Sequence, residues 1–132
     1  MPNWKAKGSN AERELIKRLH EESWSAVRMA GSGSTRFPSP DILAGNGHRR
    51  IAVECKVTKD KKKYFTKEEI EQLKTFATNF GAESWVGIRF AGEDWLFFML
   101  EDLEKTNCSF VATLDMAAMK GLTLTELLKN SE

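Results

Sequence analysis

Residues 39–57 contain two short runs typical of β-strands, joined by a tight turn, and they carry acidic residues at marked positions. Residues 42–44 are mostly apolar, residues 45–47 read Gly-Asn-Gly, and residues 50–57 are rich in β-branched and apolar side chains. An Asn-Gly pair between two such runs is a strong signal for an antiparallel hairpin. The segment therefore predicts a β-hairpin, with Asp41 at the start of its first strand and Glu54 and Lys56 on its second.

The rest of the chain predicts alternating helices and strands. A capping Ser9 or Asn10 begins a helix that runs to about residue 23, and a capping box from Thr66 begins a second, which Gly81 ends. Further strands are expected over residues 24–29, 85–90, 95–100 and 110–113, and a last short helix over residues 123–129. Residues 1–7 are expected to form a flexible arm, residues 30–40 a mobile loop and residues 58–64 an exposed basic loop. This order predicts one α/β domain over residues 1–132, with a mixed central β-sheet flanked by helices.

Charge is divided unevenly along the chain. Residues 1–67 hold fifteen Lys and Arg against seven Asp and Glu, and residues 68–132 hold five against twelve, so the net charges are +8 and −7. Such a division favours a positive surface that binds a polyanion. The alternative is an accident of surface composition.

Several classes of protein do not fit the composition. No apolar run approaches the roughly 20 residues of a membrane-spanning helix, and the N-terminal residues lack the apolar core of a secretory signal. Two cysteines make neither a disulfide framework nor a zinc cluster. No glycine-rich phosphate loop with the required lysine is present. We therefore expect an intracellular protein without a membrane partner or a nucleotide cofactor.

The hairpin gathers acids in a way that suggests chemistry. Side chains alternate along a strand, so Glu54 and Lys56 share one face while Cys55 points to the other. Closing the hairpin brings Asp41 close to Glu54, and Glu12 in the first helix is a third acid. Carboxylates held together call for a cation or a shared proton, and oxygen ligands without His suit Mg²⁺ or Mn²⁺.

A divalent ion at such a site can polarise a phosphoryl oxygen and activate a water, and a neighbouring lysine can stabilise the charge that develops. The residues thus fit metal-assisted phosphodiester hydrolysis. The alternative is that Glu54 and Lys56 form an ion pair with no catalytic role.

The same residues resemble a known nuclease pattern. Pro40-Asp41, twelve intervening residues and Glu54-Cys55-Lys56 resemble the PD-(D/E)xK signature. Four blocks in order, at residues 7–15, 27–32, 41–45 and 53–57, resemble the archaeal Holliday junction resolvases (Hjc). The resemblance covers most of the chain and is sharpest over residues 7–58.

This resemblance implies a restriction-endonuclease-like core in a homodimeric, Mg²⁺-dependent endonuclease that cuts two opposed strands of four-way junction DNA. It implies that Glu12, Asp41, Glu54 and the main-chain carbonyl of Cys55 bind the metal and that Lys56 is catalytic. It further implies that Ser32, in a mobile loop, contributes to catalysis and that Arg13 and Arg28 hold phosphates.

Other basic residues are candidates for a DNA-binding surface that recognises phosphates rather than base edges. They are Lys5, Lys7, Arg36, Arg49, Arg50, Lys59, Lys61, Lys62 and Lys63. For any single one of them, an ordinary solvated charge is the alternative.

The two strands expected over residues 85–90 and 95–100 are apolar on both faces. Either a second helix or a second subunit must cover the outer face, and we expect a symmetric dimer.

Three functions are consistent with these features. The first is a junction-resolving nuclease, the second a related nuclease that acts on another DNA structure, and the third a non-catalytic junction-binding module.

Overall fold

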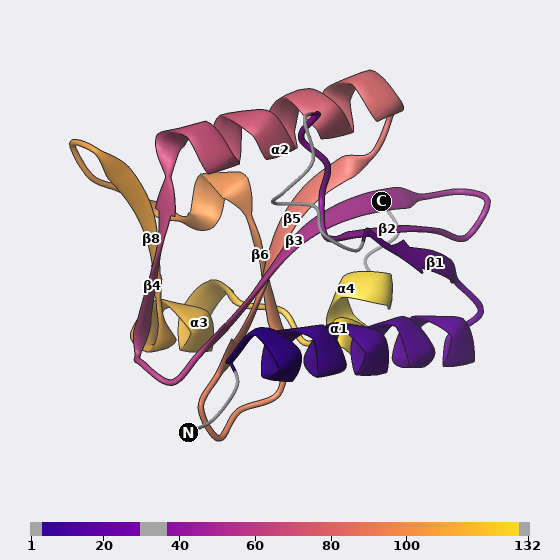
Figure 1. Ribbon diagram of the computed structural model, residues 1–132, viewed down its shortest axis with the longest axis horizontal. Helices are drawn as coiled ribbons and strands as arrows, with labels where there is room; N and C mark the ends of the chain where they lie inside the picture. The colour runs from indigo at the N-terminus through magenta and orange to yellow at the C-terminus, as the bar shows by residue number, and fades with distance from the viewer. Residues whose placement is uncertain (1–3, 30–36, 130–132) are drawn as a thin grey trace.

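The computed structural model describes residues 4–29 and 37–129, which form one α/β domain (Figure 1). The elements are α1 (Trp4–Glu21), β1 (Ser25–Arg28), β2 (Ile42–Gly45), β3 (Arg50–Thr58), β4 (Lys62–Thr66), α2 (Lys67–Phe80), β5 (Glu83–Phe90), β6 (Leu96–Met99), the 3₁₀ turn η2 (Leu100–Asp102), β7 (Glu104–Lys105), β8 (Ser109–Thr113), α3 (Leu114–Lys120) and α4 (Leu124–Lys129). No helix among these residues has the length and apolar character needed to span a membrane.

The central sheet has five strands in the order β1-β2-β3-β5-β6. Strands β3 and β5 pair in parallel, and the other neighbours pair antiparallel. The hairpin of β2 and β3 has the predicted turn, in which Gly47 adopts a φ of +94°. The prediction of a mixed sheet flanked by helices is therefore confirmed.

Helices cover both faces of this sheet (Figure 1). On one face α1 and α4 pack Leu15, Leu19 and Leu127 against inward side chains of β3 such as Val53 and Cys55. On the other face α2 packs Ile70 and Leu73 against a second core that includes Val86, Ile88, Phe90 and Phe98. The two-sided strands β5 and β6 are thus buried within one chain. They do not need a second subunit to cover them, which removes the argument for a dimer drawn from their pattern.

A second, smaller sheet stands beside the central one, with strand order β4-β8-β7. Its strand β4 occupies part of the segment predicted to be an exposed basic loop, so that prediction was wrong for residues 62–64. Lysine-rich runs have low strand propensity, and β4 forms because β8, nearly fifty residues later in the chain, pairs with it. Phe65 on its inner face is completely buried.

Two further differences concern the start of α1 and the late part of the chain. Helix α1 begins at Trp4, inside the segment predicted to be a flexible arm. The short helix α3 was not predicted, and it begins at a Thr113 cap whose side chain accepts from the Met116 amide. Most of the predicted mobile loop, residues 30–36, lies outside the described residues.

Candidate active site

Asp41 lies where β2 separates from the continuing strand β3. Its main-chain amide donates to the Val53 carbonyl at 3.1 Å, and the paired register of the two strands ends at Ile42 and Val53. Strand β3 runs on to Thr58, and the Cys55 amide on that side donates to Asp41 Oδ2 at 2.8 Å. The Asp41 carboxylate thus takes the place of a strand partner and is fixed beside residue 54.

Glu54 and Lys56 lie on the same face of β3, as the alternation predicts. Lys56 Nζ is 3.9 Å from Glu54 Oε2, and both side chains are largely buried. A closer partner of Lys56 is Glu69 on α2, whose Oε2 accepts from Nζ at 3.0 Å. Sequence reasoning assigned Glu69 only to the capping box of α2. The contact of Glu69 with Lys56 could be found only from the fold, because it depends on how α2 packs against β3.

The Glu54 carboxyl lies in an environment that disfavours its charge. Burial and the neighbouring Asp41 carboxylate raise its pKa to about 8, although Lys56 opposes the shift. For Lys56, burial lowers the pKa, but the hydrogen bond to Glu69 and the surrounding carboxylates outweigh that effect and raise it. A cation bound between Asp41 and Glu54 would offset the repulsion that adds to burial in raising the pKa of Glu54.

Glu12 joins this site from α1 but is held by an arginine. Arg28 Nε on β1 donates to Glu12 Oε1 at 2.9 Å, and Arg28 also donates to Ser9 Oγ at 2.9 Å. Burial and Asp41 raise the pKa of Glu12, against the lowering effect of Arg28 and Arg13. Arg28 therefore fixes the Glu12 carboxyl at a place where the charge of Asp41 still affects its pKa.

The donor set fits a hard divalent ion in part. Asp41 and Glu54 supply carboxylate oxygens, and the Cys55 carbonyl is a main-chain oxygen in the same segment of β3; oxygen ligands are what Mg²⁺ and Mn²⁺ take. Among the residues the structure describes, no three His, Cys, Asp or Glu side chains are grouped closely enough to hold an ion. Glu12 is thus placed as the partner of Arg28, and its role as a metal ligand stays a prediction.

A small cavity opens on this site. It has a volume of about 250 Å³ and is lined by Pro38, Ser39 and Pro40, by Glu54, and by Glu69, Gln72 and Leu73 of α2. Gln72 and Glu69 lie about one turn apart on the helix. Sequence reasoning missed both of these polar side chains, which reach the same hollow as the Glu54 carboxyl.

The basic candidates fall into different surroundings. Arg13 is exposed and donates to Asn10 Oδ1 at 3.2 Å, and Lys59, Lys61 and Lys62 are exposed, whereas Lys63 is half-buried. Lys5 and Lys7 lie in the first turns of α1. Two candidates, Ser32 and Arg36, lie outside the described residues.

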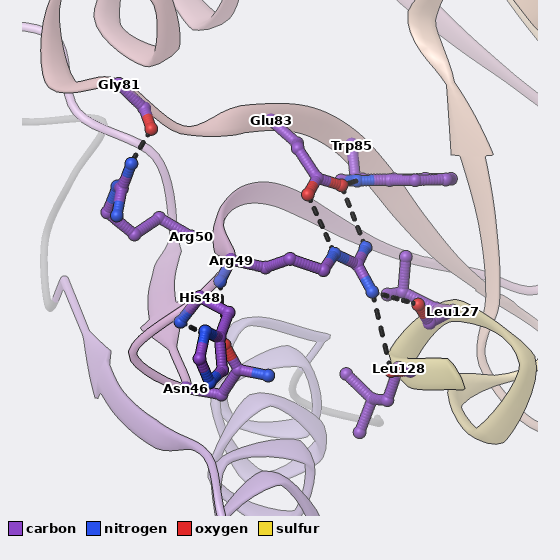
Figure 2. A network of polar contacts seen from close by, with 9 residues as sticks. All are labelled: Asn46, His48, Arg49, Arg50, Gly81, Glu83, Trp85, Leu127 and Leu128. Carbon is purple, nitrogen blue, oxygen red and sulfur yellow. Dashed lines mark hydrogen bonds and ion pairs between the residues drawn. The ribbon is translucent and has the colours of Figure 1, made fainter. Parts of the chain in front are cut away.

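Arg50 begins β3 at its hairpin end and Arg49 precedes it, so the two lie about 13 and 16 Å along the chain from Glu54. Figure 2 shows the Arg49 guanidinium between Glu83 and the end of α4: it donates to both Glu83 oxygens at 2.8 Å and to the Leu127 carbonyl at 2.8 Å. Arg50 donates to the Gly81 carbonyl at 2.9 Å. These contacts give Arg49 a structural role, and DNA binding by either arginine stays a prediction.

Comparisons with known proteins identify the relatives of this chain. The family model described as archaeal Holliday junction resolvase (Hjc) matches residues 3–132. The crossover junction endodeoxyribonuclease Hjc of Archaeoglobus fulgidus is 43% identical over 106 residues, which cover 80% of this chain and 78% of that protein. The Hjc of Sulfolobus acidocaldarius is 34% identical over 131 residues, covering 97% and 90% of the two chains.

A solved structure gives the same result in three dimensions. The structure of the Archaeoglobus fulgidus Hjc, described as a Holliday junction resolvase from an archaeal hyperthermophile, superposes with a TM-score of 0.84 at 37% identity. The match covers 93% of this chain and 96% of that one. With its sequence and its fold in agreement, the chain belongs to the archaeal Holliday junction resolvase (Hjc) family.

Proposed function

We propose that this protein is a metal-dependent, structure-selective DNA endonuclease that resolves four-way junctions by paired, symmetric phosphodiester hydrolysis in recombination and repair. The observation that carries the proposal is that Asp41, Glu54 and Lys56 lie together where β2 separates from β3, with Glu54 lining a cavity. Membership of the Hjc family supplies the substrate class. Such an enzyme acts inside the cell, on DNA.

Asp41, Glu54 and the Cys55 carbonyl would hold the ion, Mg²⁺ with Mn²⁺ as a substitute, and Glu12 is the fourth candidate ligand. When bound, the ion supplies Lewis-acid polarisation of the scissile phosphate and a more acidic water. Lys56 carries an ammonium that can donate to the charge developing on the phosphate. Arg28 keeps Glu12 in place, and Arg13, exposed on the same helix, is a candidate phosphate contact. The contribution of Ser32 rests on the family resemblance.

The remaining basic residues would bind the junction through phosphates. Lys59, Lys61 and Lys62 are exposed at the β3–β4 connection, which follows directly from the strand that carries Glu54 and Lys56. Positive charge on these lysines would let DNA phosphates bind along the surface from the active site to the smaller sheet.

A homodimer is part of the proposal, because two opposed strands need two active sites. Support comes from an apolar groove at the open edge of the central sheet, lined by Val27, Leu43 and Phe80 among others. Val27 is 54% exposed and Phe80 50%, which is unusual for side chains that are neighbours on one surface.

The test is incubation of the purified protein with a fixed four-way junction and a matched linear duplex, with Mg²⁺ or with chelator, beside an Asp41→Ala variant. Paired symmetric nicks in the junction alone, lost with chelator and in the variant, are expected. Equal cutting of the linear duplex would leave a nuclease of another specificity. Tight junction binding without cutting under any divalent ion would leave a binding module.

A further inference from the structure

We propose that Glu69 on α2 is a positioning residue for the reaction: it holds the Lys56 ammonium in the active site and keeps it away from Glu54. The inference rests on the nuclease function proposed above. It adds to the active site a residue from a helix that lies outside the sequence blocks that carry the family resemblance.

The Glu69 carboxylate is fixed from both of its oxygens. Oε1 accepts from the Thr66 amide at 2.9 Å, and Oε2 accepts from Lys56 Nζ at 3.0 Å. In return the Glu69 amide donates to Thr66 Oγ1 at 3.0 Å, which completes the capping box of α2. The side chain is therefore tied to the start of a helix before it meets the lysine, and it can offer Lys56 an acceptor at a defined point.

Lys56 has two acids within reach, and the distances decide between them. Nζ is 3.0 Å from Glu69 and 3.9 Å from Glu54. An ammonium is a point charge on a flexible stem, so without Glu69 it would move to the remaining carboxylate. Lys56 would then neutralise Glu54, the oxygen donor that the metal requires. Glu69 thus serves both groups, because it orients the lysine and leaves the Glu54 oxygens available.

The lysine is also confined by its surroundings. Its side chain is 25% exposed, and Nζ lies 6.0 Å from the centre of the buried Phe65 ring. Glu69 and Glu54 line the same cavity of about 250 Å³. The ion pairs of Lys56 among the described residues are those with Glu69 and Glu54, so the loss of Glu69 leaves Glu54 as the acid within reach of the ammonium.

The experiment compares four variants of the full chain. Glu69→Gln keeps the shape and removes the charge, and Glu69→Asp keeps the charge. Thr66→Ala removes the side-chain half of the capping box but leaves the ion pair with Lys56. Glu68→Gln makes the same charge change at an exposed neighbour in the same helical turn.

Three quantities are measured: single-turnover cleavage of a bound four-way junction, junction affinity without divalent ions, and the ζ-ammonium NMR signal of Lys56 in metal-free protein. The NMR signal, identified with Lys56→Arg, reports the ion pair independently of cleavage. Melting temperatures show that each variant is folded at the assay temperature.

Glu69→Gln is expected to slow cleavage about tenfold or more at unchanged junction affinity, since small misplacements of a reacting group cost factors of this size. It should also shift or broaden the Lys56 signal. Glu69→Asp should recover part of both. Thr66→Ala should lower the melting temperature yet cleave normally, and Glu68→Gln should match the wild type.

The inference is overturned if folded Glu69→Gln protein cleaves at the wild-type rate or leaves the Lys56 signal unchanged. It is also overturned if Thr66→Ala slows cleavage as much as Glu69→Gln, because the role of Glu69 would then be to cap the helix. A wild-type protein that cuts no junction would instead refute the proposed function, and the NMR result would still decide whether Glu69 holds Lys56.

Discussion

At the scale of single residues, Glu54 shows how the fold prepares a carboxyl group for a cation. Its pKa rises from the ordinary 4.5 to about 8 because the side chain is buried and faces Asp41. Its unfolded counterpart releases the proton near 4.5, so the folded state binds it more tightly. The contribution to stability is complete below pH 4.5 and is lost as pH rises through about 8.

Glu54→Gln should therefore remove the loss of stability that Glu54 causes as the pH rises. In metal-free protein, the free energy of unfolding of the wild type is expected to fall relative to that of the variant across this pH range. Urea unfolding of both proteins with chelator present, at several pH values, measures the difference. Parallel pH profiles for the two proteins would contradict the raised pKa.

The residues of the site differ in how far the sequence could place them. Strand alternation and the Asn-Gly turn suffice to put Glu54 and Lys56 on one face and Asp41 beside them, since these relations are local. Glu69 meets Lys56 only because α2 packs across β3, and Arg49 meets Glu83 only because β3 and β5 pair in parallel. Such contacts depend on tertiary packing, which charge pattern and spacing do not encode.

At the scale of elements, the same distinction separates the confirmed predictions from the wrong ones. Helix α2 was predicted from its capping box and its Gly81 stop, and both are present. Strand β4 was missed because its lysines and its exposed Tyr64 match no strand pattern in isolation, and a distant partner strand creates it. The burial of both faces of β5 and β6 could not be predicted either, because it depends on where α1, α2 and α4 pack.

The contact between β5 and β6 depends on the absence of a side chain at Gly87. A Cβ atom there would lie 2.8 Å from a ring carbon of Phe97, which is buried in the core with Val53. Gly87→Ala is expected to destabilise the protein by about 1–3 kcal/mol through overpacking. Gly8→Ala, in α1 with open space around its Cβ position, should instead stabilise by about 0.5–1 kcal/mol.

Urea unfolding at one pH measures both changes, and Gly8→Ala serves as the matched control for adding a methyl group. A Gly87→Ala protein as stable as the wild type would mean that β5 and β6 can move apart at no cost.

At the scale of the whole molecule, the proposed homodimer has to bring two active sites to one junction. The central sheet ends at β1, where Val27 of that strand and Phe80, the final residue of α2, expose apolar surface and line one groove. The Phe80 ring stacks on Phe76 at a centroid distance of 5.6 Å, so it is held in a defined place. Because both faces of the sheet are already covered, this edge is a more suitable dimer surface than the faces of β5 and β6.

Light scattering after size exclusion should therefore give about twice the chain mass of 15.0 kDa at micromolar concentration. Phe80→Ser should yield a folded monomer, because it removes apolar area that a symmetric pair would bury twice. Met119→Ser, at an exposed apolar side chain on α3, is the control and should stay dimeric. The monomeric variant should nick one strand of a junction at a time, since a single site cannot cut two opposed strands together. A wild-type monomer that makes paired cuts would show that the junction itself brings two copies together.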